Sequence, residues 1–434
     1  MPHNSHFHKR HLILNIINHL GPISRTELIN LTDYRPASIS ALIKELLDEK
    51  LIVESGNYSA GHGRKRTLLE INKTHLCAVG ISFSPEAVTL IVAQFDGTIL
   101  KEDTLPLTVS LHSDAHRQQL IRQILDGVAG LLEDFQEKEI LGIGISDPSH
   151  DPTSYQSEHS LPVNYTHYND WIHLGLKPQL EAAFRLRVET YSGVALPAMA
   201  EHRFGVAKGA KDFICVELSN GIGSSLFCNG MAVSGARGMA GELGHTVIDR
   251  TADSSHLCYC GKPGCAEAAT AYPALVSQLE DALERGVFSS LTDHLAPNRE
   301  ITVSAIRQAL EENDRMCMHY VKEIAIRLGV VIANAVNLLN PELIVLYGFM
   351  LELGDYFLHH LKDAIRENTL SVSGDPQIRI SESLQTILPL GAVAEIYATY
   401  LRSEDYKWVY RLQPSDLEEW TLIQNNINET GDNV

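Results

Sequence analysis

The sequence contains no long hydrophobic run and no apolar leader. No uninterrupted stretch reaches the roughly eighteen apolar residues of a membrane-spanning helix, so we expect no membrane span. The N-terminus carries several histidines and lacks the apolar segment that precedes a cleavage site, so we expect no signal peptide. A hydrophobic content of 44% and a charged content of 21% disfavour a disordered chain, and 434 residues allow two or three domains.

Cysteine is also scarce, with seven residues in the whole chain. Four of them are scattered in apolar surroundings, which is typical of buried thiols: Cys77, Cys215, Cys228 and Cys317. Free thiols indicate a reducing compartment, so we expect a cytoplasmic protein.

Acidic residues outnumber basic residues in the chain as a whole, and only the N-terminal segment has more basic than acidic residues. The chain carries 35 Lys and Arg against 54 Asp and Glu, a formal net charge of −19. Residues 1–70 hold nine basic against seven acidic side chains, which leaves 26 against 47 for the remainder. Because an acidic body repels the phosphate backbone, any contact with DNA is expected to be confined to the N-terminal segment.

One short span concentrates the remaining three cysteines. His245 is followed after thirteen residues by Cys258, and then by Cys260 and Cys265. Three thiolates and an imidazole form the tetrahedral set that Zn²⁺ prefers in a structural site, and the intervening Gly and Pro residues allow sharp turns. We therefore predict bound Zn²⁺. The alternatives are a reduced thiol cluster without a metal, or a disulfide.

The first seventy residues show three short helical patterns followed by two strands. Helices are expected over residues 8–20, 24–31 and 36–47, the second opened by a capping box from Ser24 to Glu27. Strands are expected over residues 51–53 and 68–71, around a tip rich in Gly and Arg at residues 61–66. This order predicts a winged helix-turn-helix, the third helix of which enters the major groove of DNA.

The basic and polar residues of this segment fall on the third helix and on the tip. The predicted DNA-binding residues are Arg35, Ser38, Ser40, Lys44, Gly63 and Arg64. The helix residues would approach base edges or phosphates, and the tip would suit a minor groove or the backbone. The alternative is a trihelical module that docks a protein, such as a transporter component, since such a module uses the same packing.

The rest of the chain alternates strand and helix patterns, which predicts α/β layers. Expected strands lie at residues 77–81, 87–93, 140–145, 187–190, 213–218 and 343–346. Expected helices lie at residues 114–137, 180–184, 194–204, 301–339 and 351–367, with a closing helix from residue 390. Two loops rich in glycine, residues 219–223 and 235–241, lie ahead of the cysteine span.

Residues 242–267 contain a Glu-x-x-His pattern followed by Cys-x-Cys-Gly-x-x-Gly-Cys-x-Glu. This combination resembles the signature of the ROK family of repressors, open reading frames and sugar kinases. The resemblance covers nearly the whole chain and implies a two-lobed, actin-like (ribonuclease-H-like) α/β body with a sugar pocket in its cleft. Members that carry an N-terminal winged helix are sugar-responsive repressors, whereas the kinases lack that domain.

The resemblance also implies a division into domains. The winged helix would occupy residues 1–72, and the first lobe residues 73–195, closed by the C-terminal helix near residues 390–405. The second lobe, with the zinc site and a dimerisation surface, would occupy residues 196–389. Residues 406–434 would form a C-terminal extension.

Roles for the motif residues follow from the same resemblance. His245, Cys258, Cys260 and Cys265 match structural zinc ligands. Glu242, His245 and Glu267 match positions that bind sugar hydroxyls, and a carboxylate can accept two such hydrogen bonds. The alternative is that both glutamates only brace the metal loop.

Three departures from the kinases of the family argue against phosphoryl transfer. Ser82 stands where the phosphate loop has an acid, and Pro85 removes a backbone donor from that loop. Gly193 stands at the catalytic Asp, and Ser192 at the preceding Asn, where it could keep one hydrogen bond to a sugar. Tyr347 brings a bulky ring to the adenosine side. We therefore expect no enzyme, although a divergent sugar kinase that uses another base stays open.

Together these features predict a transcriptional regulator, a repressor of carbohydrate uptake or catabolic genes. Its expected partners are a double-stranded operator with an inverted repeat, a carbohydrate effector in the interlobe cleft, and a second copy of itself as a homodimer or dimer of dimers. No membrane partner is expected. A regulator controlled by a protein instead of a sugar is the alternative.

Overall fold

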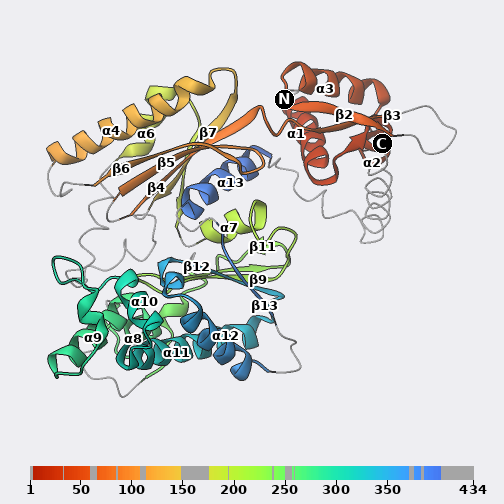
Figure 1. Cartoon of the computed structure of the whole chain (residues 1–434). Coiled ribbons are helices and arrows are strands. Elements are labelled where there is room, and N and C mark those ends of the chain that lie inside the picture. Colours follow the sequence, from red (N-terminus) through yellow and green to blue (C-terminus); the bar gives the residue numbers. More distant parts are fainter. Residues whose placement is uncertain are drawn as a thin grey trace.

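The part of the chain that the structure describes contains three sheets, a small one near the N-terminus and two of five strands each (Figure 1). The computed structural model describes residues 3–32, 34–58, 66–84, 87–107, 114–147, 175–193, 195–236, 239–249, 257, 258, 260–370, 376–382 and 386–401. No helix within these ranges is long and apolar enough to cross a bilayer.

The N-terminal segment packs three helices against the small antiparallel sheet. These helices are α1 (His3–Leu20), α2 (Arg25–Thr32) and α3 (Pro36–Asp48). The strands β1 (Ile23–Ser24), β2 (Ile52–Tyr58) and β3 (Arg66–Ile71) pair in the order β1-β3-β2. The capping box is confirmed, because the Ser24 N–H donates to Glu27 Oε2 over 2.7 Å and the Glu27 N–H donates to Ser24 Oγ over 3.4 Å.

The first five-stranded sheet has the order β6-β5-β4-β7-β8. Its strands are β4 (Leu76–Phe83), β5 (Ala87–Gln94), β6 (Ile99–Pro106), β7 (Glu139–Asp147) and β8 (Val188–Ser192). Strand β5 pairs antiparallel with β4 and β6, whereas β4, β7 and β8 run parallel. Helices α4 (Asp114–Leu132) and α6 (Leu176–Phe184) cover one face, where Val79, Ile81 and Ile124 share a core.

The second five-stranded sheet has the order β11-β10-β9-β12-β13. Its strands are β9 (Phe213–Glu217), β10 (Ser224–Cys228), β11 (Met231–Ala232), β12 (Leu343–Tyr347) and β13 (Gln377–Ile380). The helices of this half are α8 (Ala266–Thr270), α9 (Tyr272–Glu284), α10 (Val303–Glu311), α11 (Arg315–Leu339) and α12 (Asp355–Asn368). The expected single helix over residues 301–339 is divided because Asp314 caps a new helix, accepting from the Cys317 N–H over 2.8 Å.

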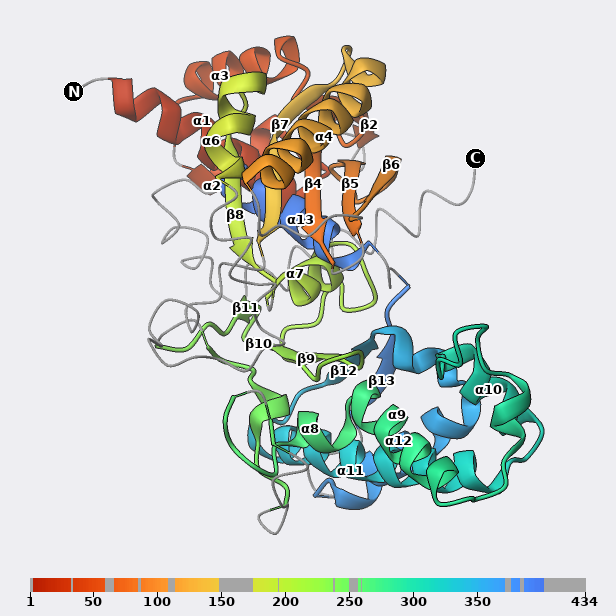
Figure 2. The same cartoon turned by 90° about the vertical axis from the view of Figure 1, so that its left-hand side faces the viewer.

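Both five-stranded sheets have the same connectivity, which divides the body into two lobes. Numbered within its own half, each sheet has the strand order 3-2-1-4-5, with three antiparallel strands followed by two parallel ones. Figure 2 shows the two sheets one above the other, each with helices on its outer face.

Two helices lie on the inner faces of the sheets. Both views place α7 (Leu196–Arg203) between the sheets and α13 (Ile387–Leu401) against the first sheet (Figures 1 and 2). One apolar cluster joins Ala78 of β4, Ala198 of α7, Phe213 of β9 and Val393 of α13. The same cluster extends to Ile13 of α1, so the N-terminal segment and both lobes share one continuous core.

Candidate metal centre and ligand site

The structure brings the four predicted metal ligands together. The ligand atoms of His245, Cys258, Cys260 and Cys265 all lie within 4.8 Å of one another. Cys258 Sγ lies 3.6 Å from His245 Nδ1, and Cys260 Sγ lies 3.6 Å from Cys265 Sγ. A tetrahedral zinc site places two sulfurs about 3.8 Å apart and a sulfur and a nitrogen about 3.5 Å apart. These two separations are close to those values, so the cluster could hold a four-coordinate metal.

Two glycines give the metal loop its shape. Gly261 and Gly264 have φ angles of 83° and 78°, which favour glycine. A Cβ on Gly264 would lie 1.6 Å from the Asp249 carbonyl oxygen, so no other residue fits there. The Ile248 N–H donates to the Gly264 carbonyl over 2.8 Å, which fixes the segment after His245 against the cysteine loop.

The cysteines of the cluster are free thiols, and without a cation their surroundings disfavour the negatively charged thiolate form. All seven cysteines are unpaired in the structure, which gives no support to the disulfide alternative. Burial is the main cause that raises the pKa of Cys258, and the neighbouring thiols Cys260 and Cys265 raise it further. Burial also raises the pKa of Cys265, with a smaller contribution from Glu267. A divalent cation would offset this cost, since metal binding stabilises thiolates.

His245 links the metal ligands to the first predicted sugar ligand. It ends the 3₁₀ turn Leu243–His245, which directs Nδ1 toward Cys258 while Nε2 lies 3.7 Å from Glu242 Oε2. One imidazole can therefore bind a metal through Nδ1 and donate from Nε2 to a carboxylate or a ligand oxygen. A carboxylate on the outer nitrogen orients a metal-bound histidine, so Glu242 is placed for either of its two predicted roles.

Glu267 joins the metal loop to the glycine-rich turn at residues 219–223. Its Oε2 accepts a hydrogen bond from the Ile222 N–H over 3.0 Å. A Cβ on Gly221 would lie 2.9 Å from that oxygen, and a Cβ on Gly244 would lie 3.2 Å from the Glu267 Cβ. Glu242 and Glu267 thus belong to neighbouring segments, and one oxygen of Glu267 already braces the loop.

Glu217, a half-buried glutamate that was not predicted from the sequence, lies beside this turn. Glu217 ends β9, and its Oε2 accepts from the Tyr347 hydroxyl over 3.3 Å. Burial raises the pKa of Glu217, and the charge of Glu267 raises it further. The available signal was a single acid in an otherwise apolar strand. The ring of Tyr347 itself is buried, with 6% of its surface exposed.

Three of the positions that differ from the kinases, Ser82, Ser192 and Gly193, lie at the carboxyl end of the first sheet, whereas Tyr347 lies on β12 of the second sheet and Pro85 lies outside the described residues. Strand pairing places Ser82 opposite Ser146, and a Cβ on Gly193 would lie 3.5 Å from Ser146 Oγ. Ser192 ends β8 opposite Asp147, and only its backbone is described. These residues lie at the carboxyl ends of parallel strands, where α/β proteins bind ligands.

Three of the polar residues predicted to contact DNA, Ser38, Ser40 and Lys44, lie on α3, and Arg35 is its N-cap residue. Arg35, Ser40 and Lys44 are exposed and Ser38 is half-buried, whereas Ile39, Leu42, Ile43 and Leu46 are buried. None of the ion pairs between described residues involves Arg35 or Lys44. Gly63 and Arg64 lie outside the described residues.

A model of the ROK family matches residues 78–394. The chain belongs to the ROK family. Its body has the actin-like α/β fold of that family, in agreement with the repeated sheet and the His/Cys₃ cluster.

Proteins named as transcriptional regulators match most of this chain. It is 28% identical to the xylose repressor of Caldicellulosiruptor bescii, over 91% of this chain and 96% of the relative. It is 26% identical to the DNA-binding transcriptional dual regulator NagC of Escherichia coli, over 82% of this chain and 84% of the relative.

Solved ROK structures share the fold to different extents. A ROK family transcriptional regulator, a homologue of the E. coli MLC protein, has a TM-score of 0.71 at 23% identity and covers 91% of this chain and 97% of its own. The ROK glucokinase of Streptomyces griseus, solved with glucose and AMPPNP, has a TM-score of 0.56 at 20% identity and covers 73% of this chain and 98% of its own.

Proposed function

We propose that this ROK protein is a sequence-specific DNA-binding regulator, a repressor of carbohydrate uptake or catabolic genes that is controlled by a sugar. The observation that carries the proposal is the N-terminal segment. It presents Arg35, Ser40 and Lys44 on the exposed face of α3, ahead of a ROK body. Relatives named as repressors align over nearly the whole chain, whereas the glucokinase covers only 73% of it.

In this proposal α2, α3 and the β2–β3 hairpin form the winged helix-turn-helix, with α3 in the major groove. Basic side chains on α3 would contact phosphates or base edges, and the acidic body would stay away from the duplex. A two-fold dimer would present two such helices to an inverted repeat. The proposal includes the domain limits given above, at residues 72, 195 and 389, and a location in the cytoplasm.

Binding to the promoter region upstream of its own gene tests this function. Fluorescence anisotropy should show an affinity at least roughly 10³-fold tighter than for random DNA at the same salt concentration. A protein that distinguishes no sequence in that region would contradict the proposal. Binding of a protein, such as a transporter component, in place of DNA would favour the protein-docking alternative.

We further propose that the effector is a carbohydrate held by Glu242, His245, Glu267 and Ser192. The proximity of the first three supports this, since Glu242 Oε2 lies 3.7 Å from His245 Nε2 and Glu267 lies against Gly244 and the glycine-rich turn. Thermal-shift and calorimetric screening with D-xylose, D-glucose, N-acetylglucosamine and their phosphates tests it. Glu242→Gln should weaken any hit, whereas the exposed Glu284→Gln should not. If no sugar causes a response, the alternative that Glu242 and Glu267 only brace the metal loop is favoured.

The metal held by the cluster is proposed to be a structural Zn²⁺. All four positions are filled by protein ligands, which leaves no open position for catalysis. Elemental analysis of the purified protein should give about one zinc per chain.

We also propose that the protein does not transfer phosphoryl groups. Ser82 and Gly193 supply neither the acid nor the base that this chemistry needs. Tyr347, whose hydroxyl donates to Glu217, stands at the position where the kinases have a glycine on the adenosine side. A coupled assay for ADP release in the presence of each screened sugar should show no turnover. Turnover that depends on a sugar would establish the divergent kinase instead.

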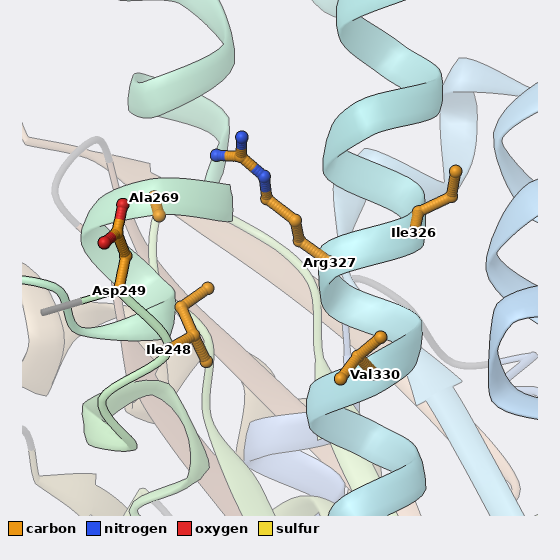
Figure 3. A pocket seen from close by; sticks show the side chains of 6 residues that line it. All are labelled: Ile248, Asp249, Ala269, Ile326, Arg327 and Val330. Atoms are coloured by element: carbon orange, nitrogen blue, oxygen red, sulfur yellow. The ribbon is translucent and has the colours of Figure 1, made fainter. Parts of the chain in front are cut away.

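The dimer, or dimer of dimers, is proposed to form through the second lobe, beside the metal loop. A hollow of about 280 Å³ lies there. Figure 3 shows Asp249 and Arg327 on opposite sides of it. It is lined by Ile248, Asp249, Ala269, Ile326, Arg327 and Val330. Val247 and Leu257 of the metal loop are 46% and 54% exposed. Light scattering of the Val330→Asp variant should show a shift toward monomer.

A further inference from the structure

Helix α13 is held against the first lobe at backbone distance. A Cβ on Gly80 of β4 would lie 2.3 Å from the Pro389 carbonyl oxygen, and a Cβ on Gly144 of β7 would lie 2.5 Å from the Ala392 carbonyl oxygen. Only glycine permits these approaches, so α13 cannot slide over the sheet without separating from it. It moves with β4 and β7 as one body.

Helix α7 is clamped to α13 in the same way. A Cβ on Gly391 would lie 2.2 Å from the Leu196 carbonyl oxygen, in the first turn of α7. At the other end of α7 the Arg203 guanidinium lies 5.3 Å from the ring centre of Tyr397 on α13. Within the described residues Arg203 Nε is buried without a hydrogen-bond partner, so contact with rings holds this end.

Helix α7 also touches the ligand edge and the second lobe. It begins three residues after Gly193, at the proposed sugar site. Its buried Glu201 accepts from the Ser381 hydroxyl, directly after β13 of the second sheet, and from the Val206 N–H over 2.8 Å. A change in the angle between the lobes therefore acts on α7, and through α7 on α13.

The far end of α13 holds the N-terminal segment. The rings of His11 on α1 and Tyr400 on α13 meet edge to face, with centres 5.9 Å apart. Asn15 Nδ2 donates to the Leu401 carbonyl. That carbonyl lies in the last turn of α13, where no intrahelical donor exists. His11 and Asn15 are each only 6% exposed, although their neighbours in the cluster are apolar.

We propose that α7 and α13 carry the ligand state of the body to the DNA-binding segment, and that Asn15 and His11 are the positioning residues that hold α1 on the end of α13. The inference rests on the proposed function, because it states how that function is regulated. A sugar that binds two lobe arrangements with different affinity would shift α7. Since α1 is fixed to α13, the two α3 helices of a dimer would change their separation.

Asn15→Leu tests the contact without need of a known ligand. Leucine keeps the size of the side chain and removes the donor, which leaves the Leu401 carbonyl unsatisfied. Hydrogen exchange of the full-length protein should become at least tenfold faster in α1 and in the last turn of α13, while β4 and α11 stay within twofold. Asn18→Leu is the matched control, because Asn18 lies on α1 without a hydrogen bond to the described part of α13. Unchanged exchange in Asn15→Leu overturns the proposal.

A second measurement separates positioning from mere stability. D-xylose, D-glucose and N-acetylglucosamine are titrated into the wild type and the Asn15→Leu variant, with and without promoter DNA. The variant should bind the active sugar with an affinity within twofold of that of the wild type. The ratio of its DNA affinities without and with the sugar should fall to near one. An unchanged response to the sugar overturns the proposal. If no sugar binds, the carbohydrate part of the proposed function fails, and the exchange experiment still decides the inference.

Discussion

Replacement of Cys258 by serine removes one metal ligand and tests what holds the second lobe together. Cys258 is 2% exposed, and its sulfur lies 3.6 Å from His245 Nδ1. A serine hydroxyl is a poor ligand for zinc at neutral pH, so three ligands remain. The loop then keeps only its hydrogen bonds, such as that from the Ile248 N–H to the Gly264 carbonyl.

The expected loss of stability follows from linkage between metal binding and folding. If free zinc is present at about a thousand times the dissociation constant, the metal contributes about 4 kcal/mol to the free energy of unfolding. For a lobe of roughly 200 residues this corresponds to a Tm lower by about 8–16 °C. Because Glu242 and Glu267 flank the loop, sugar binding should weaken as well.

Differential scanning calorimetry and elemental analysis measure both effects on the same sample. Cys317→Ser is the matched control, because Cys317 is fully buried in α11 and lies outside the His245–Cys265 cluster. The control should keep its zinc and lose about 1–3 kcal/mol from burial of a hydroxyl. A Cys258→Ser protein that retains one zinc per chain, or that loses it without any fall in Tm, would refute the metal as a structural clamp.

Three further outcomes are expected. The double variant Arg35→Ala, Lys44→Ala should weaken promoter binding at least tenfold. The slope of log affinity against log salt concentration should become shallower by about 0.9 for each phosphate that is no longer neutralised. The control Arg285→Ala, at an exposed position, should change neither quantity, and an unchanged affinity of the double variant would exclude α3 from the interface. Burial is the main cause that lowers the pKa of His11; the charges of Arg10 and His8 lower it further, and the backbone of Tyr400 opposes the shift. Because the buried imidazole is favoured in its neutral form, α1 should pack fully above about pH 6.5 and loosen as the pH falls below that value. Hydrogen exchange of α1 measures this, and His11→Phe should abolish the dependence. Gly391→Ala should destabilise the α7–α13 contact by about 1–3 kcal/mol, seen as a lower denaturation midpoint; an unchanged midpoint would show that the helices can separate freely.

Much of the local structure was readable from residue patterns. The capping box of α2, the buried stripe of α3 and the turn residues of the metal loop each act over a few positions, so sequence spacing predicts them. The boundary between α10 and α11 was not predicted, because the apolar periodicity continues across the Asp314 cap.

The site was predicted in part for the same reason. The metal ligands follow one another within a short span, and their chemistry alone selects a metal. Glu217 was missed because its significance depends on Tyr347, which is 130 residues away and meets it only through the pairing of β9 with β12.

The sequence by itself therefore determined the ROK family, the four candidate metal ligands and the charge asymmetry that separates a basic N-terminal segment from an acidic body. Only the tertiary structure decided how these parts are joined. Contacts such as Gly391 with Leu196, and Asn15 with Leu401, link residues about 200 to 390 positions apart. No local pattern encodes such contacts, because they arise when separate helices are pressed together by a shared apolar core.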